Sequence, residues 1–305
     1  MVKNDALLIK NIKKAYGGNE VLKGINLTIR KGSIFSLLGS NGAGKTTMVK
    51  ILSTLIQADS GEAFICGYDI KKNAGPVRGL ISVTGQYAAV DGLLTARENL
   101  RMIGLLFHVK NISEKVEELL LQFNLINAAN LPVSTFSGGM RRRLDIAMSL
   151  IGNPDIIFLD EPTTGLDPQS RIEMWKVIRR MSDAGVTIFL TTQYIDEAEQ
   201  LADHIAVLHQ GKIIAQGSSK ELKSRLVSST ILLGFTDQSS YLAARQKMHD
   251  YSYMVNDDVM SISIITDGSV KQLVTLLENL NGVEIAFLEQ KQASLEDVFL
   301  TLVSK

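Results

Sequence analysis

The chain has 305 residues, 45% of them hydrophobic, so it is long enough to bury a substantial core. Its 32 basic and 32 acidic side chains give zero net charge, which excludes a global field favouring nucleic acid or an anionic membrane. The single cysteine, Cys66, excludes an internal disulfide, and no stretch of about 18 residues is apolar enough to span a bilayer. The opening MVKNDALLIKN has no apolar signal region, so we expect a cytosolic address.

The first predicted elements are strands that alternate apolar and polar residues. They are punctuated by Gly17, Gly18 and Gly24, which is typical of an antiparallel sheet. The predicted strands are Leu7–Ile12, Val21–Ile29 and Gly61–Ile65.

A second group of strands is apolar throughout and alternates with helical segments. This pattern predicts an α/β fold with a mainly parallel sheet covered on both faces. The members are Ile34–Leu38, Ile156–Leu159, Thr187–Leu190 and Ile205–Leu208.

Helical periodicity fills the region from about Leu94 to Asn130, where ENLRMIGLLF and SEKVEELLLQF are amphipathic. We therefore expect a helical subdomain over about 87–152, inserted between strands of a domain that covers residues 1–222. All five prolines lie before residue 223. Residues 223–305 then predict a small α+β appendage, with strands at TILLGF, MSISII and VEIAFL and helices at YLAARQKM, SVKQLVTLLENL and SLEDVFLTLV.

The stretch SLLGSNGAGKTTMVKIL predicts a phosphate-binding loop. A strand ends at Leu38 and a helix opens at Lys45, so the G-x-x-x-x-G-K-T pattern stands in the context it requires. Backbone amides and the helix N-terminus would surround phosphates, Lys45 would reach the outer ones, and Thr46 would offer a hydroxyl to Mg²⁺. The alternative is a glycine-rich turn that only connects strand and helix. The candidate residues are Gly39, Ser40, Asn41, Gly42, Ala43, Gly44, Lys45, Thr46 and Thr47.

A second strand, DIIFLDEP, ends in two acids. Asp160 can hold Mg²⁺ through its water shell, and Glu161 is placed to accept a proton from an attacking water. For the pair alone, two carboxylates that solvate a turn would be the preferred interpretation.

Between these motifs, Ser137, Gly138 and Gly139 begin a helix whose N-terminus is receptive to an anion. The three arginines that follow, Arg141–Arg143, are interpreted as a solvated face rather than a nucleic-acid patch.

With these motifs in this order, residues 1 to about 220 resemble the ATP-binding-cassette ATPases. GSNGAGKTT looks like the Walker A loop, FSGGM like the family signature and IIFLDEP like the Walker B strand with its catalytic glutamate. The resemblance implies a P-loop NTPase cassette, with a RecA-like parallel core, an antiparallel β subdomain and a helical subdomain. It further implies that Tyr16 stacks on adenine, that Gln86 is the Q-loop glutamine near Mg²⁺, and that Asp167 belongs to the D-loop.

The family usually carries a histidine that touches the γ-phosphate at the strand-to-helix hinge in TTQYIDEAEQLAD, and here the residue is Gln193. An amide can still donate a hydrogen bond to phosphate but does not titrate near neutral pH. We expect a working cassette with a modified switch; a low-turnover, nucleotide-gated module is the alternative.

The resemblance also implies partners. Two cassettes would sandwich two ATP molecules between the Walker A loop of one and Ser137–Gly139 of the other, as a homodimer or with a paralogue, and would drive a separate integral membrane subunit. Together with the closing ASLEDVFLTL, the cassette motifs are similar to those of daunorubicin/doxorubicin exporter ATPases. We therefore expect a peripheral ATPase with ATP and Mg²⁺ at the cytoplasmic face of the membrane, and no nucleic-acid partner. A soluble cassette ATPase acting on ribosomes or DNA is the other alternative, but such proteins generally carry two cassettes or a long coiled-coil insertion.

Overall fold

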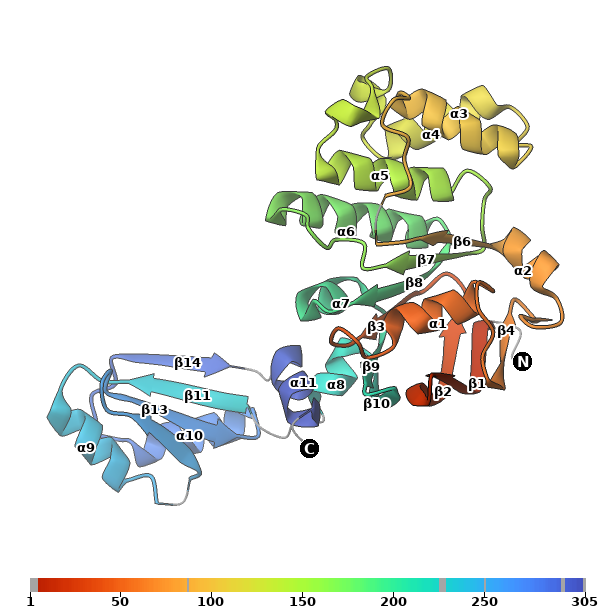
Figure 1. Cartoon of the computed structure of the whole chain (residues 1–305). Coiled ribbons are helices and arrows are strands. Elements are labelled where there is room, and N and C mark those ends of the chain that lie inside the picture. Colours follow the sequence, from red (N-terminus) through yellow and green to blue (C-terminus); the bar gives the residue numbers. More distant parts are fainter. Residues whose placement is uncertain (1–4, 87, 225–228, 250, 292–293, 304–305) are drawn as a thin grey trace. The chain divides into compact units, whose positions relative to one another are not determined.

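A computed structural model describes residues 5–86, 88–224, 229–249, 251–291 and 294–303 (Figure 1). The chain divides into two compact units, residues 1–219 and 220–305.

The centre of the first unit is a six-stranded sheet in the order β10-β9-β3-β8-β7-β6. All neighbouring pairs are parallel except β10 with β9. Its strands are β3 (Ile34–Leu38), β6 (Ile81–Thr84), β7 (Ile156–Asp160), β8 (Thr187–Thr192), β9 (His204–His209) and β10 (Lys212–Gly217).

This sheet is buried on both faces because alternate side chains enter two different cores. Phe158 and Phe189 belong to one core, and Leu159 and Leu190 to the other. Helix α1 (Lys45–Leu52) contributes to the first core, whereas α5 (Gly138–Ser149) and α6 (Pro168–Asp183) contribute to the second. Every residue of β3, β7 and β8 is consequently buried, as parallel strands with helices on both faces require.

An antiparallel sheet in the order β2-β1-β4-β5 lies against the first core. It consists of β1 (Asp5–Tyr16), β2 (Asn19–Arg30), β4 (Ser60–Ile65) and β5 (Tyr68–Asp69), and α2 (Ala74–Leu80) then leads into β6. Tyr16 ends β1, where the hairpin turns at Gly17 and Gly18 with positive φ angles.

Between β6 and β7 the chain forms helices that share the second core, at the yellow and yellow-green end of Figure 1. Helix α3 begins with a capping box in which Thr95 and Glu98 exchange hydrogen bonds. The elements are α3 (Ala96–Leu106), α4 (Ile112–Gln122), two short 3₁₀ turns (Ile126–Ala128 and Val133–Thr135) and α5; helix α7 (Ile195–Leu201) follows β8.

The second unit is an antiparallel sheet in the order β12-β13-β11-β14, with its own core around Leu233, Ile262 and Leu276. Its elements are α8 (Ser219–Ser224, which begins at the last residue of the first unit), β11 (Ser229–Gly234), α9 (Gln238–Gln246), β12 (Tyr253–Asn256), β13 (Ser261–Thr266), α10 (Val270–Asn279), β14 (Phe287–Lys291) and α11 (Leu295–Val303).

The predicted parallel and antiparallel sheets are both confirmed. The strand predicted at VEIAFL is largely misplaced: β14 starts only at Phe287, while Val283 and Ile285 pack against the core from an irregular segment. Apolar alternation there reflects burial without ladder pairing. In the part of the chain that the structure describes, no helix combines the length and the hydropathy needed to cross a bilayer.

Candidate functional site

The site lies where three neighbouring parallel strands end at one edge of the sheet. Leu38 of β3 pairs with Thr192 of β8, and Thr191 of β8 pairs with Asp160 of β7. The loop after β3, the acids at the end of β7 and Gln193 after β8 are therefore neighbours in space. In open α/β sheets, ligands bind in this position, outside the carboxyl ends of the strands.

A pocket of about 650 Å³ opens at this edge, which is within the usual range for a small-molecule site. It brings together most of the residues predicted from the sequence and adds two others, Val21 and Thr164. The lining residues are Tyr16, Val21, Asn41, Gly42, Gly44, Lys45, Thr46, Thr47, Gln86, Asp160, Glu161, Thr164 and Gln193.

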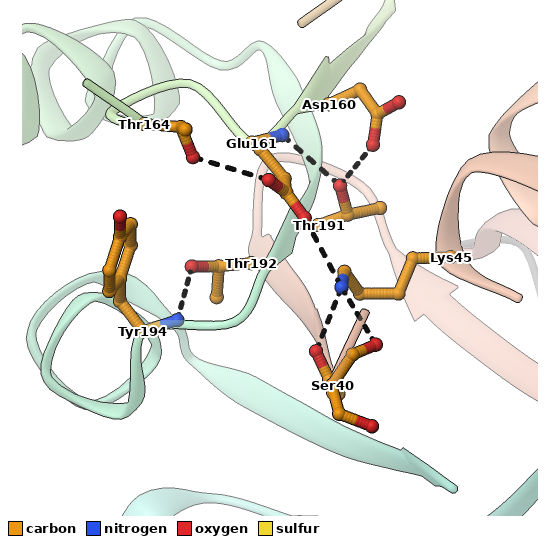
Figure 2. Close-up of polar contacts among 9 residues, drawn as sticks. Ser40, Lys45, Asp160, Glu161, Thr164, Thr191, Thr192 and Tyr194 are labelled. Atoms are coloured by element: carbon orange, nitrogen blue, oxygen red, sulfur yellow. Dashed lines mark hydrogen bonds and ion pairs between the residues drawn. The ribbon is translucent and has the colours of Figure 1, made fainter. Parts of the chain in front are cut away.

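The loop after β3 wraps around the ammonium group of Lys45. Lys45 is only 4% exposed, and its Nζ donates to the carbonyl oxygens of Gly39 at 2.8 Å and Ser40 at 3.1 Å (Figure 2). Gly44, which precedes α1, has φ +113°, and a Cβ there would lie 2.8 Å from the side chain of Leu22. Glycine is therefore required for the loop to enter the helix in this way.

The two acids at the end of β7 have different environments (Figure 2). Asp160 is 6% exposed and accepts a hydrogen bond from Thr191 Oγ1 at 2.5 Å. Glu161 has φ +49°, and its backbone N–H donates to the carbonyl of Thr191 at 3.1 Å. A non-glycine residue in the left-handed region is strained, and such strain concentrates at functional sites.

The carboxylate of Glu161 connects the acids to the loop. Its Oε1 lies 3.2 Å from Lys45 Nζ, and its Oε2 accepts from Thr164 Oγ1 at 3.2 Å. Lys45 therefore stands between the loop carbonyls and a carboxylate, and an anion reaching Lys45 would compete with Glu161 for the ammonium.

Three polar or aromatic side chains complete the rim. Tyr16 is half exposed, with Lys14 Nζ 5.4 Å from its ring centroid. Gln86 is exposed just after β6, and Gln193 is half-buried between β8 and α7. Next to it, the Tyr194 amide donates to Thr192 Oγ1 at 2.9 Å, which fixes the backbone as the strand turns into the helix.

Among the described residues, Ser137, Gly138, Gly139 and Asp167 do not line this pocket. Ser137 caps α5 and accepts from the Met140 amide, while Asp167 caps α6 and accepts from the Ser170 amide. The two helix starts lie together, because a Cβ on Gly139 would be 2.8 Å from Ser170 Oγ. Hydrogen bonds from Ser170 lower the pKa of Asp167, so this exposed carboxylate is charged.

The interpretation of Arg141–Arg143 as a solvated face is wrong for Arg142. Arg141 is exposed, but Arg142 is buried and forms an ion pair with Asp145 at 3.0 Å. The i,i+3 spacing of these two charges on the apolar side of α5 was the available sequence signal.

The oxygen donors at the strand ends suit a hard divalent cation with few protein ligands and several waters, since Thr46 offers an exposed hydroxyl and Asp160 a carboxylate. Over the described ranges of the chain, no three His, Cys, Asp or Glu side chains gather into a metal cluster.

Four residues after Gln193, the carboxyl group of Glu197 in α7 is fully buried. Its Oε1 accepts from Thr163 Oγ1 at 2.8 Å and from Trp175 Nε1 at 3.2 Å. Burial raises the pKa of Glu197, and these hydrogen bonds only partly oppose the rise. Glu197 thus links the loop after Glu161 to the start of α7.

This environment predicts a pH-dependent stability. Because the folded state binds the Glu197 proton more tightly than the unfolded state, its contribution is largest below the ordinary pKa of 4.5 and is lost as pH rises through the raised value. Between the two pKa values, the free energy of unfolding of the wild type should fall by up to about 1.4 kcal/mol per pH unit because of Glu197. Glu197→Gln should not show this fall. Urea unfolding of wild type and variant at several pH values measures the difference. Parallel curves would contradict the prediction, and Glu173→Gln, at the half-buried ion pair with Arg143, should follow the wild type.

Comparison with known proteins places this arrangement in a family. Residues 22–164 match the ABC transporter family. The chain is 41% identical over 303 residues to the daunorubicin/doxorubicin resistance ATP-binding protein DrrA of Streptomyces peucetius, covering 97% of this chain and 92% of that protein. It is 33% identical over 306 residues to the linearmycin resistance ATP-binding protein LnrL of Bacillus subtilis, covering 98% of each.

A solved structure gives the same result at the level of the fold. A dimeric ATP-binding cassette in a post-hydrolysis state, bound to ADP and Pi, superposes with a TM-score of 0.63 at 27% identity and covers 70% of this chain and 98% of that one. The chain therefore belongs to the ABC transporter family, as an ATP-binding and ATP-hydrolysing subunit.

Proposed function

We propose that this subunit hydrolyses ATP with Mg²⁺ to drive a separate membrane subunit of a drug or antibiotic exporter. The observation that carries the proposal is the pocket in which the loop, Lys45, Glu161 and Gln193 meet at one sheet edge. The class of cargo is taken from relatives named for resistance to daunorubicin, doxorubicin and linearmycin.

In this proposal each part of the pocket has one task. The backbone amides of Gly39–Thr47 cradle the phosphates at the N-terminus of α1, with Lys45 on the outer ones. Tyr16, at the rim, stacks on adenine. Thr46, Gln86 and Asp160 would hold Mg²⁺, which when bound offsets negative charge on the outer phosphates.

Glu161 accepts the proton of the attacking water. Its contact with Lys45 makes its availability depend on whether nucleotide is bound. A γ-phosphate at Lys45 replaces the carboxylate as partner of the ammonium, so substrate binding and the freeing of Glu161 are linked. Gln193 donates its amide N–H to the γ-phosphate, a contact that does not depend on protonation.

Glu161→Gln should lower ATP turnover by about 10²- to 10⁴-fold, because the amide cannot accept the proton. ATP affinity should change little, since the loop and Lys45 remain. Steady-state phosphate release and nucleotide titration measure the two quantities, with Glu173→Gln as a control at a half-buried glutamate that, among the described residues, does not line the pocket. Turnover of Glu161→Gln within about threefold of wild type would exclude Glu161 as the proton acceptor.

Gln193→His should keep turnover within about threefold and add an ionisation near pH 6.5 to the pH–rate profile. In Gln193→Ala, ATP turnover should fall about tenfold, because the hydrogen bond to the γ-phosphate is lost. The profiles are measured on all three proteins. A wild type at background level that Gln193→His accelerates strongly would instead support a low-turnover regulatory module.

A second cassette would complete the site, because the Ser137–Gly139 helix start and Asp167 stand away from the pocket of their own chain among the residues described. We propose a homodimer in which each helix start meets the γ-phosphate held by the other chain. The dimeric solved cassette supports this arrangement. The division into a cassette of residues 1–222 and an appendage of residues 223–305 with a role in assembly or regulation is likewise a proposal.

The dimer is testable by light scattering of Glu161→Gln protein, whose chain mass is 33.4 kDa. ATP with Mg²⁺ should about double the measured mass. Gly138→Asp should abolish the doubling by placing a carboxylate against the γ-phosphate. Gly138→Ala should retain it, since among the described residues outside its own helix an added Cβ would meet only Leu166, at 4.0 Å. If the measured mass does not change on adding ATP, or if the two Gly138 variants behave alike, the proposed dimer is contradicted.

The membrane partner and the peripheral location at the cytoplasmic face follow from the same proposal, and no nucleic-acid partner is part of it. Subunits of this family are named for transporters, and the described helices of this chain do not themselves suffice to span a bilayer.

A further inference from the structure

The buried pair Arg142–Asp145 lies about one to two turns beyond the helix start at Ser137. Both side chains are nearly inaccessible, 5% and 6% exposed. A buried ion pair is weak evidence for stability, because desolvation offsets much of the attraction. Its hydrogen bonds therefore matter more than its charge, and they reach two loops far apart in the sequence.

The first loop is the one that carries Glu161. Arg142 Nε donates to the carbonyl of Pro162 at 3.0 Å, and Nη2 donates to the carbonyl of Asp160 at 3.3 Å. The guanidinium thus holds the carbonyl groups of the two residues that flank Glu161, a residue whose backbone is in the strained left-handed region. A rigid fork with several donors is needed for this arrangement.

The second loop is the one that carries Gln86. Arg142 Nη1 donates to the carbonyl of Gly85 at 2.6 Å and to Asp145 Oδ2 at 3.0 Å. Asp145 Oδ1 in turn accepts from the Ala89 amide at 2.9 Å. The pair therefore holds the chain immediately before Gln86 and three residues after it.

Helix α5 carries both the helix start at Ser137 and the side chain that contacts the two loops. Ser137 caps α5, and Arg142 follows five residues later, about 7.5 Å along the helix axis. A shift of the helix start would therefore move the guanidinium and, through its hydrogen bonds, both loops.

We propose that Arg142 and Asp145 form a positioning pair that sets Glu161 and Gln86 relative to the helix start at Ser137. The inference rests on the proposed function, in which that helix start meets the partner chain's nucleotide. Closure of the dimer then places the proton acceptor and the Q-loop glutamine together. Neither Arg142 nor Asp145 touches the pocket: among the described residues, they are not part of its lining.

Arg142→Lys tests the proposal. Lysine keeps the positive charge, but its single ammonium group cannot donate to all four acceptors, which lie apart from one another. We expect kcat to fall about ten- to hundredfold, as small misplacements of reacting groups do, with KM for ATP within about twofold. Arg143→Lys is the matched control, since among the residues that the structure describes Arg143 forms an ion pair with the half-buried Glu173 and no contact with either loop is seen. An unchanged kcat in Arg142→Lys would overturn the proposal. So would a fall in kcat that is fully explained by a smaller fraction of protein able to bind ATP.

A second variant covers the case in which Arg142→Lys folds poorly. Asp145→Asn keeps the shape and one acceptor oxygen but removes the charge, so a smaller fall in kcat and faster hydrogen exchange at the Ala89 amide are expected. Wild-type kcat and unchanged exchange in Asp145→Asn would also overturn the proposal.

Wild-type and Glu161→Gln protein belong in the same series, because they separate the two claims. Absence of Glu161-dependent turnover in the wild type counts against the proposed function, while the Ala89 exchange rates still report on the pair. Glu161-dependent turnover that survives Arg142→Lys counts against the positioning pair alone.

Discussion

The parallel, in-register pairing of β3, β8 and β7 is the constraint on which the site depends. It makes Leu38, Thr192 and Asp160 neighbours, although they are far apart in the sequence. The loop, the acids and the hinge glutamine can therefore be short extensions of buried strands. The rigidity of the site is that of the sheet, whose two faces lie in two separate cores.

At this edge the charges are arranged so that a bound polyanion would compete with Glu161 for Lys45. Lys45 is buried between two loop carbonyls and Glu161, whose carboxylate is also held by Thr164. Arg142 holds the backbone beside Glu161 instead of its carboxylate. The side chain that would take the proton can thus change partner while the peptide groups beside it stay fixed.

Much of this could be predicted from the sequence, because the motifs are local. The loop and the Asp160–Glu161 pair each follow an apolar strand, and apolar strands predict a parallel sheet whose carboxyl ends meet. For Arg142 the i,i+3 spacing could indicate the pair with Asp145, but its other acceptors are backbone carbonyls of distant loops that carry no sequence signal. The misplaced strand near Val283 has a similar cause, since apolar alternation reports burial and not strand pairing.

Co-purification from membranes tests the central claim, a cassette that drives a separate membrane subunit, most directly. Tagged Glu161→Gln protein would be isolated in mild detergent with ATP and Mg²⁺ from cells that contain its natural partners, and the bound proteins identified and quantified. The account predicts a stoichiometric polytopic membrane protein, in equal amount to the cassette. Recovery of ribosomal or DNA-bound material without any membrane protein would contradict it and would support a soluble cassette ATPase.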